Sequence, residues 1–356
     1  MNGILFPGPP RPLGMTLFGT SGIRGPVGDT VTAELALSVG RALAVDSDRV
    51  VVGRDPRASG EYLQAALVAG LRESGTDVVD VGVAATPTVA RAVGWREADA
   101  GVSVTASHNP PEDNGLKLWQ PSGQAFDTER RRTIEERIRE GAFEPAAWDS
   151  VGDRESWDAS ARHADAIRDS LDVGSLSSHV VVDVGNGAGG LTVDVLQELG
   201  CHVETLNAQP DGAFPGRPSE PKAENCGSLS TLVAERDADI GIAHDGDADR
   251  MRAVAADGTY LSGDALLAIF AREAAGTGER VAVPVDTSLA VADSLAEADV
   301  DVEYTPVGDV YVAEAASAPG VAFGGEPSGA WIWPDRTLCP DGPLAACTVA
   351  ALDSER

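Results

Sequence analysis

Apolar runs and helical patterns alternate along most of the chain. Short runs rich in Val, Ile and Ala predict buried strands at 49–53, 77–81, 100–104, 180–184, 202–206, 239–243, 252–255, 281–283, 302–305 and 321–323. Apolar residues at helical spacing predict helices at 32–45, 61–73, 87–93, 128–140, 158–171, 191–199, 228–236, 263–274, 288–296 and 343–352. Strands that alternate with helices in this way are typical of α/β domains.

The alternation restarts twice, which predicts three consecutive α/β domains with mixed sheets. The third series of elements is expected to begin at the strand 252–255, and an irregular acidic stretch at 141–157 is the expected linker between the first two domains. The expected segments are a disordered, Pro- and Gly-rich lead at 1–14 and domains at 15–150, 151–254 and 255–356.

Acidic residues dominate the charge of the chain. Its 356 residues include 56 Asp and Glu against 27 Lys and Arg, and the net charge is −29. This charge disfavours nucleic-acid binding, because phosphate backbones need Lys and Arg. Acidic residues spread along the whole sequence predict a halophilic protein, in which concentrated salt screens the self-repulsion. An acidic partner-binding face is the alternative.

The sequence carries no targeting or membrane signal. No apolar run reaches membrane-spanning length, and the start lacks the basic and apolar regions of a signal peptide. The cysteines form no C-x-x-C pair, so we expect reduced thiols in a cytoplasmic protein that contacts no membrane. A homo-oligomer is compatible with this sequence. The cysteines are Cys201, Cys226, Cys339 and Cys347.

A serine lies just after the predicted strand 100–104, in Thr105–Pro110 (T-A-S-H-N-P), here called the serine loop. Ligands bind outside the carboxyl ends of strands in open α/β sheets. Ser107 is a candidate nucleophile, with His108 beside it and Lys117 ten residues further on. Pro111 and Asn114-Gly115 predict that the loop continues. A Ser/Asn/Pro turn with a chance histidine is the alternative.

Three aspartates alternate with small residues in Asp245–Arg250 (D-G-D-A-D-R), here called the acidic loop. Converging carboxylates imply a cation, and hard oxygen ligands favour Mg²⁺. A solvated acidic turn and a haloacid-dehalogenase-type D-x-D nucleophile are the alternatives. An EF-hand is disfavoured, because the closing ligand position falls on Ala256.

Glycines at 185, 187 and 190 match G-x-G-x-x-G between a predicted strand and helix, and Glu204 lies near the expected ribose-binding position. This pattern alone is weak evidence for a dinucleotide site. Glycines also serve tight turns and close helix–sheet contact, which is the structural alternative.

Two further stretches complete a family pattern. Phe18–Gly25 (F-G-T-S-G-I-R-G), the serine loop, the acidic loop and Gly325–Gly329 (G-E-P-S-G, here called the glutamate loop) occur in the order and spacing of the α-D-phosphohexomutases. From about Leu17 to Asp341, the chain resembles phosphoglucomutase/phosphomannomutase and phosphoglucosamine mutase.

The resemblance implies a reaction and its residues. Ser107 would carry a phosphoryl group, one oxygen of which completes a Mg²⁺ site of the three acidic-loop aspartates. A sugar monophosphate would take this group and return its other phosphate, so that a hexose bisphosphate links hexose 1-phosphate and hexose 6-phosphate of glucose, mannose or glucosamine. The implied metal ligands are Ser107, Asp245, Asp247 and Asp249.

The resemblance also assigns catalytic and substrate-binding roles. Lys117 would be a general base or a phosphate contact, His108 would orient Lys117 or the serine loop, and Arg24 would supply positive charge. Ala330 stands where many relatives have histidine, which leaves the acid/base group of one half-reaction undefined. The implied substrate-binding residues are Thr20, Ser21, Arg250, Gly308, Asp309, Glu326 and Ser328.

Members of this family carry a fourth, α+β domain with an R-x-S-G-T-E-P-x-x-R loop. No such pattern follows Gly329, and Arg217–Pro221 (R-P-S-E-P) resembles it only superficially as a proline-rich turn. We therefore expect a fold without the fourth domain and weak binding of the phosphate that is not reacting. A non-catalytic or impaired sugar-phosphate-binding protein is the alternative function, and a nucleotide-dependent dehydrogenase is a distant one.

The charge generates a first prediction. The melting temperature should rise between low and molar potassium chloride, because screening relieves repulsion among the excess carboxylates. Thermal unfolding followed by circular dichroism measures it. A melting temperature that falls over this range contradicts the salt-adaptation hypothesis.

Overall fold

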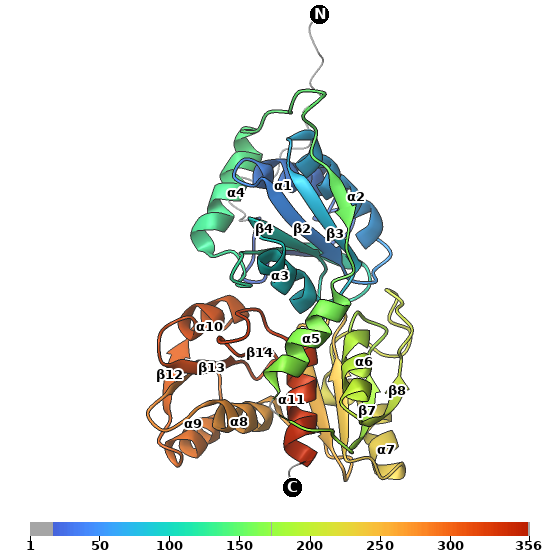
Figure 1. The fold of residues 1–356 in the computed structure, drawn as a ribbon, viewed down its shortest axis with the longest axis vertical. Coiled ribbons are helices and arrows are strands. Elements are labelled where there is room, and N and C mark those ends of the chain that lie inside the picture. The colour runs from blue at the N-terminus through green and yellow to red at the C-terminus, as the bar shows by residue number, and fades with distance from the viewer. Residues whose placement is uncertain (1–16, 172, 355–356) are drawn as a thin grey trace, which may run out of the picture.

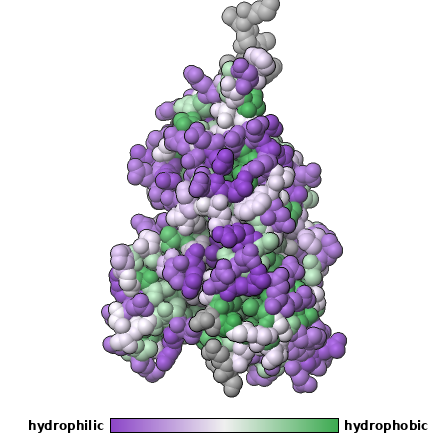
Figure 2. Space-filling view, in the orientation of Figure 1, coloured by the Kyte–Doolittle hydropathy of each residue, from purple (hydrophilic) through white to green (hydrophobic). Residues whose placement is uncertain are grey.

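The structure, a computed structural model, describes residues 17–171 and 173–354, so the expected lead at 1–14 lies outside the described residues. Three sheets form three units, with the first above the other two in Figure 1. Hydrophilic side chains cover most of the first unit on the face that Figure 2 shows. No described helix is long and apolar enough to cross a bilayer. The expected three α/β units with mixed sheets are confirmed.

The first sheet combines parallel and antiparallel strands. In spatial order it contains β1 (Ile23–Pro26), β5 (Asp113–Trp119), β4 (Ala100–Val104), β2 (Arg49–Arg54), β3 (Asp77–Val83) and β6 (Arg154–Ser156). In this sheet β5 runs antiparallel to both of its neighbours, β1 and β4, whereas the pairs β4–β2, β2–β3 and β3–β6 are parallel. Its helices are α1 (Ala33–Ala44), α2 (Gly60–Glu73), α3 (Thr86–Trp95) and α4 (Thr128–Glu140). Thr32 caps α1, since its hydroxyl accepts a hydrogen bond from Leu35 N.

Two predictions for the first unit are wrong. Asn114-Gly115 is not a loop but part of β5, because its pairing with β1 and a hydrogen bond from Thr105 N to the Gly115 carbonyl override the local turn preference. Gly115 permits this pairing, since a Cβ there would lie 2.2 Å from the Ile23 carbonyl oxygen. The expected linker at 141–157 contains β6, which pairs with β3 and extends the first sheet.

The second sheet has the spatial order β10 (Met251–Ala255), β9 (Ile240–His244), β7 (His179–Asp183) and β8 (His202–Leu206). Strand β10, which was expected to open the third series, instead pairs antiparallel with β9. The other elements of this unit are α5 (Ser160–Ser170), α6 (Gly190–Glu198), the 3₁₀ helix η1 (Ala223–Asn225) and α7 (Gly227–Glu235).

The third sheet has the spatial order β12 (Asp301–Thr305), β11 (Arg280–Pro284), β13 (Val321–Gly325) and β14 (Trp331–Ile332). Its helices are α8 (Gly263–Ala274), α9 (Leu289–Ala296) and α10 (Asp309–Ala316). The last helix, α11 (Gly342–Ser354), packs against α6, β9 and β10 of the second unit (Figure 1). The second and third units therefore share one hydrophobic core.

Helices α1 and α2 cross so closely that two glycines face main-chain atoms. A Cβ on Gly40 would lie 2.3 Å from the Leu67 carbonyl oxygen, and a Cβ on Gly70 would lie 2.2 Å from that of Leu37. No side chain fits at these separations without moving a helix.

The crossing generates a second prediction. Gly70→Ala should lower the free energy of unfolding by about 1–3 kcal/mol, because the clash outweighs the gain of about 1 kcal/mol in helix propensity. Chemical denaturation measures it. Gly190→Ala at the start of α6 is the control, since nothing lies within 4 Å of a Cβ there and no loss is expected. A Gly70→Ala variant as stable as the wild type contradicts this packing argument.

Candidate functional site

The serine loop and the acidic loop meet although they come from different sheets. The serine loop joins β4 to β5, and the acidic loop joins β9 to β10. The Ser107 hydroxyl donates a hydrogen bond to Asp245 Oδ2 at 2.6 Å and lies 3.5 Å from Asp249 Oδ1. The predicted nucleophile and two of the predicted metal ligands therefore share one buried site.

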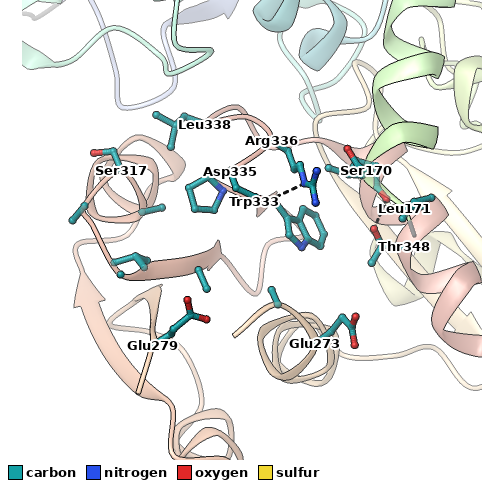
Figure 3. A pocket seen from close by; sticks show the side chains of 18 of the residues that line it. Ser170, Leu171, Glu273, Glu279, Ser317, Trp333, Asp335, Arg336, Leu338 and Thr348 are labelled. Carbon is teal, nitrogen blue, oxygen red and sulfur yellow. Dashed lines mark hydrogen bonds and ion pairs between the residues drawn. The ribbon is translucent and has the colours of Figure 1, made fainter. Parts of the chain in front are cut away.

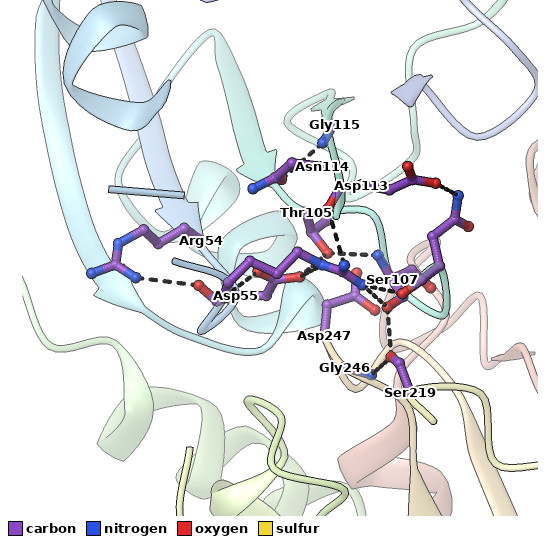
Figure 4. Close-up of polar contacts among 12 residues, drawn as sticks. Arg54, Asp55, Thr105, Ser107, Asp113, Asn114, Gly115, Ser219, Gly246 and Asp247 are labelled. Atoms are coloured by element: carbon purple, nitrogen blue, oxygen red, sulfur yellow. Dashed lines mark hydrogen bonds and ion pairs between the residues drawn. The ribbon is translucent and has the colours of Figure 1, made fainter. Parts of the chain in front are cut away.

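The backbone of Ser107 is held in an unusual conformation. Its φ is 51°, in the left-handed region that non-glycine residues seldom adopt. Ser107 N donates to Thr105 Oγ1 at 2.8 Å, and the Thr105 hydroxyl donates to Asp55 Oδ2 at 2.7 Å (Figure 4). Such a conformation persists only where the surroundings determine it, and this hydrogen-bonded chain is part of that support.

Arg57 provides the rest of the support for this conformation. The sequence analysis did not identify this residue. Its guanidinium is fully buried and donates to Asp55 Oδ2 at 2.9 Å. The same group donates to serine-loop carbonyls, at 2.8 Å for Ser107 and 2.6 Å for Asn109, and also to those of Pro110 and Asp113. Burial raises the pKa of Asp55 to about 6, although Arg57 opposes the shift. One arginine thus fixes most of the loop.

Asp245, Asp247 and Asp249 can each direct one carboxylate oxygen to a common point, because these oxygens lie within 4.8 Å of one another. Burial and the neighbouring carboxylates raise the pKa of both Asp245 and Asp247. Asp247 Oδ2 accepts from Thr86 Oγ1 at 2.7 Å, whereas its buried Oδ1 has no hydrogen-bond partner among the described residues. An unpaired buried oxygen within an anionic cluster fits a bound cation.

Lys117 lies on the other side of Asp249. Its Nζ lies 3.2 Å from Asp249 Oδ2 and 2.7 Å from Asp309 Oδ2. Burial disfavours the ammonium charge, but Asp309 and Asp249 outweigh it and raise the pKa of Lys117. Burial likewise opposes the charge on Asp249, but Lys117 and Arg250 lower the pKa of that carboxyl. Lys117 is thus held as a cation, which favours the predicted phosphate contact over the predicted general base.

The third unit reaches the site through Asp309 at the start of α10. Ser21 Oγ donates to Asp309 Oδ1 at 3.4 Å, which links the Phe18–Gly25 stretch to the third unit. In the glutamate loop, Glu326 accepts from Gly308 N at 2.8 Å and from Ser328 Oγ at 3.0 Å. Burial and Asp309 raise the pKa of Glu326.

The remaining predicted residues lie around this cluster. Arg24 Nε is buried without a hydrogen-bond partner in the described ranges, and Arg250 N donates to Asp245 Oδ1 at 3.2 Å. His108 Nδ1 lies 3.2 Å from Ser107 Oγ, and burial, Arg250 and Arg24 lower the pKa of His108 to about 3. A Cβ on Gly308 would lie 3.6 Å from Thr20 Cβ, so Thr20 belongs to the same edge.

The glycine-rich turn at 185–190 packs against the acidic loop. Ala188 N donates to the Gly246 carbonyl at 3.0 Å, and a Cβ on Gly187 would lie 2.7 Å from the same oxygen. Gly187 thus serves close backbone approach and Gly185, with a φ of 65°, serves a tight turn, which agrees with the structural alternative for these two glycines. A cavity of about 720 Å³ lies elsewhere, beside α8 and α11, and is lined by Trp333, Arg336 and Thr348 among others (Figure 3). None of the predicted site residues lines it.

Comparisons with known proteins match most of the chain to one family. Models of the phosphoglucomutase/phosphomannomutase α/β/α domains I, II and III match residues 15–145, 161–258 and 262–356. A probable phosphoglucosamine mutase of Methanosarcina barkeri is 48% identical over 96% of this chain and 78% of its own length. The probable phosphoglucosamine mutase of Methanopyrus kandleri is 47% identical over 94% of this chain and 75% of its own length.

A solved structure supports the same placement. The crystal structure of a phosphoglucomutase/phosphomannomutase family protein from Burkholderia thailandensis is 31% identical to this chain, with a TM-score of 0.84. The match covers 94% of this chain and 77% of that protein.

The raised pKa values generate a third prediction. A divalent cation must displace protons from Asp245 and Asp247, so its binding should weaken as pH falls through their raised pKa values. The rise in melting temperature caused by Mg²⁺ or Mn²⁺ should therefore be larger at about pH 8 than at about pH 5.5. Asp247→Asn should diminish this rise, whereas Asp257→Asn, an exposed turn aspartate, should leave it intact. Equal stabilisation of wild type and Asp247→Asn contradicts the metal site.

Proposed function

The chain belongs to the phosphoglucomutase/phosphomannomutase family and is a phosphohexomutase, and from that premise we propose that it moves phosphate between the 1- and 6-positions of a hexose through Ser107. The observation that carries this proposal is the Ser107 hydroxyl, 2.6 Å from a carboxylate of a buried triaspartate cluster. A nucleophilic oxygen beside a cation site suits phosphoryl transfer, in which positioning and charge neutralisation do most of the work.

Each half-reaction exchanges one P–O bond for another. The bond between Ser107 Oγ and phosphorus breaks as a hydroxyl oxygen of the sugar monophosphate bonds to phosphorus. In the overall balance, the proton of that hydroxyl ends on the released Ser107 Oγ, which becomes a hydroxyl again. The resulting hexose bisphosphate turns round, and Ser107 takes back the other phosphate. Asp245, Asp247 and Asp249 would hold Mg²⁺, which suits an all-oxygen donor set. When bound, Mg²⁺ supplies positive charge beside the transferring phosphoryl group.

The charged side chains divide the remaining tasks. Lys117, held protonated by Asp249 and Asp309, offers positive charge to a phosphate rather than a basic nitrogen. Arg24 offers a buried Nε without a partner in the described part of the chain. His108 stays neutral because of its lowered pKa, so its imidazole orients the Ser107 oxygen through a hydrogen bond instead of storing a proton.

Glucosamine phosphate is the substrate that we propose. The two curated relatives described above are both named probable phosphoglucosamine mutase. The Glu326 carboxylate is held by Gly308 N and Ser328 Oγ, so it presents a fixed acceptor for sugar hydroxyl or amino groups. A site built to pair with such groups rejects a sugar that leaves them unpaired.

The mechanism generates a fourth prediction. Ser107→Ala should lower turnover of glucosamine 6-phosphate by roughly 10⁴-fold or more, because no other oxygen can carry the phosphoryl group. Intact-mass measurement should show a phosphoryl group on the wild type after incubation with hexose bisphosphate, and none on the variant. Ser38→Ala, on the exposed face of α1, is the control. Near-native activity of Ser107→Ala, measured in parallel with glucose and mannose phosphates, contradicts the proposal.

A further inference from the structure

The hydroxyl of Ser219 joins the serine loop to the acidic loop. It donates a hydrogen bond to the Ser107 carbonyl at 2.8 Å and accepts one from Gly246 N at 3.0 Å (Figure 4). Ser219 is only 3% exposed. We propose that Ser219 is a positioning residue that sets the serine loop against the acidic loop for phosphoryl transfer, an inference that rests on the proposed function.

Each loop is first fixed to its own sheet by a buried Asp–Arg pair. Arg57 and Asp55 hold the serine loop, as described above. In the second unit, Arg217 Nε donates to Asp183 Oδ2 at 2.6 Å, and its Nη2 donates to the His244 carbonyl at 2.6 Å, directly before the acidic loop. The two pairs make each loop rigid, but neither pair reaches across to the other loop.

Arg217 also fixes the main chain of Ser219 itself. Its Nη1 donates to the carbonyls of Pro218 at 3.1 Å and Ser219 at 3.2 Å. Ser219 is therefore held rigidly by the second unit, and its hydroxyl fixes the main chain of Ser107 relative to that unit. The stretch Arg217–Pro221, interpreted from sequence as a proline-rich turn, thus lies at the centre of the loop interface.

Other contacts also join the first unit to the acidic loop, among them the Lys117–Asp249 ion pair described above. Thr86 donates to Asp247 through both its N and its Oγ1, at 2.8 and 2.7 Å, which fixes the middle of the acidic loop. The Ser107 hydroxyl donates to Asp245, but it loses that hydrogen whenever its oxygen carries the phosphoryl group. The carbonyl of Ser107 is unaffected by phosphorylation. The hydrogen bond from Ser219 to the Ser107 carbonyl can therefore persist through both half-reactions, whereas the hydrogen bond from the Ser107 hydroxyl to Asp245 cannot.

The acidic loop approaches Ser219 and Ser107 so closely that a side chain at position 246 would clash. A Cβ on Gly246 would lie 2.7 Å from Ser219 Oγ and 2.9 Å from the Ser107 carbonyl oxygen. Without the Ser219 hydroxyl, the buried Gly246 N–H loses its partner, and the acidic loop must shift to find another. A shift of this kind moves Asp245 and Asp247 relative to Ser107.

The test compares Ser219→Ala with a matched loss of a hydroxyl elsewhere. Thr76→Val is the control, because the Thr76 hydroxyl also donates to a buried carbonyl, that of Ser47 at 2.7 Å, and lies at the opposite edge of the first sheet. We expect Ser219→Ala to lower kcat by about tenfold to a hundredfold with KM for the sugar phosphate unchanged, since misplacing reacting groups costs rate on this scale. We also expect its affinity for Mn²⁺, measured by calorimetry, to fall. Thr76→Val should change neither quantity.

A Ser219→Ala variant that differs from wild type only in melting temperature, with kcat and Mn²⁺ affinity unchanged, overturns the proposal. Ser219→Cys, which keeps a side chain of similar shape and a weaker donor, is the second variant and should lose less of both. If the wild type converts no hexose phosphate, the proposed function fails, but the Mn²⁺ affinities of wild type, Ser219→Ala and Thr76→Val still decide whether Ser219 positions the acidic loop.

Discussion

The confinement of three carboxylates in one buried site is the constraint on which the structure around it depends. Asp245, Asp247 and Asp249 are shielded from water and repel one another, and such an arrangement is unfavourable without compensation. The compensation comes from all three units. Lys117 and Thr86 come from the first, Arg250 from the end of the acidic loop, and Asp309 from the third unit orients Lys117. Because no single unit can stabilise the cluster, the site forms only when the units are together.

Buried arginines organise the main chain around this cluster. The fully buried Arg57 and the nearly buried Arg217 each pair with one aspartate and direct their remaining N–H groups to loop carbonyls. A guanidinium suits this task, because its donors lie in a fixed plane and its charge is never lost. The chain thus uses arginine to shape loops, whereas Lys117, one of its two lysines, supplies charge at the centre of the site.

Local patterns predicted much of the fold and the chemical groups of the site. Most of the strands and helices follow from hydrophobic spacing, although β1, β5, β6, β14 and α10 were not predicted. Ser107 and the three aspartates follow from their position after strands. What the sequence could not predict depends on contacts between distant segments. Asn114-Gly115 has the composition of a turn, yet β1 pairs with it on one side and Thr105 N donates to the Gly115 carbonyl on the other. Arg57 was not identified, and Ser219 lay in a predicted proline-rich turn, because the partners of both residues lie far away in sequence. A signal for Arg57 existed, since it follows a buried strand that ends at the same edge as the serine loop.

The two interfaces of the site differ in how much apolar packing they contain. The glutamate loop is placed relative to the acidic loop by the core that the second and third units share, where Phe270 stacks edge-on against Trp331 and Trp333. Hydrogen bonds from Met251 N to the Gly329 carbonyl and from Trp331 Nε1 to the Met251 carbonyl, both 3.0 Å, add to this core. The serine loop is placed by hydrogen bonds and charges, including those of Ser219 and Thr86. Apolar packing tolerates small rearrangements, whereas a hydrogen bond fails when its geometry changes by a few tenths of an ångström to one ångström. The contacts of Ser219 and Thr86 therefore set the alignment of the reacting oxygen, and the shared core, together with the hydrogen bond at Gly329, keeps the sugar-facing loop within reach of it.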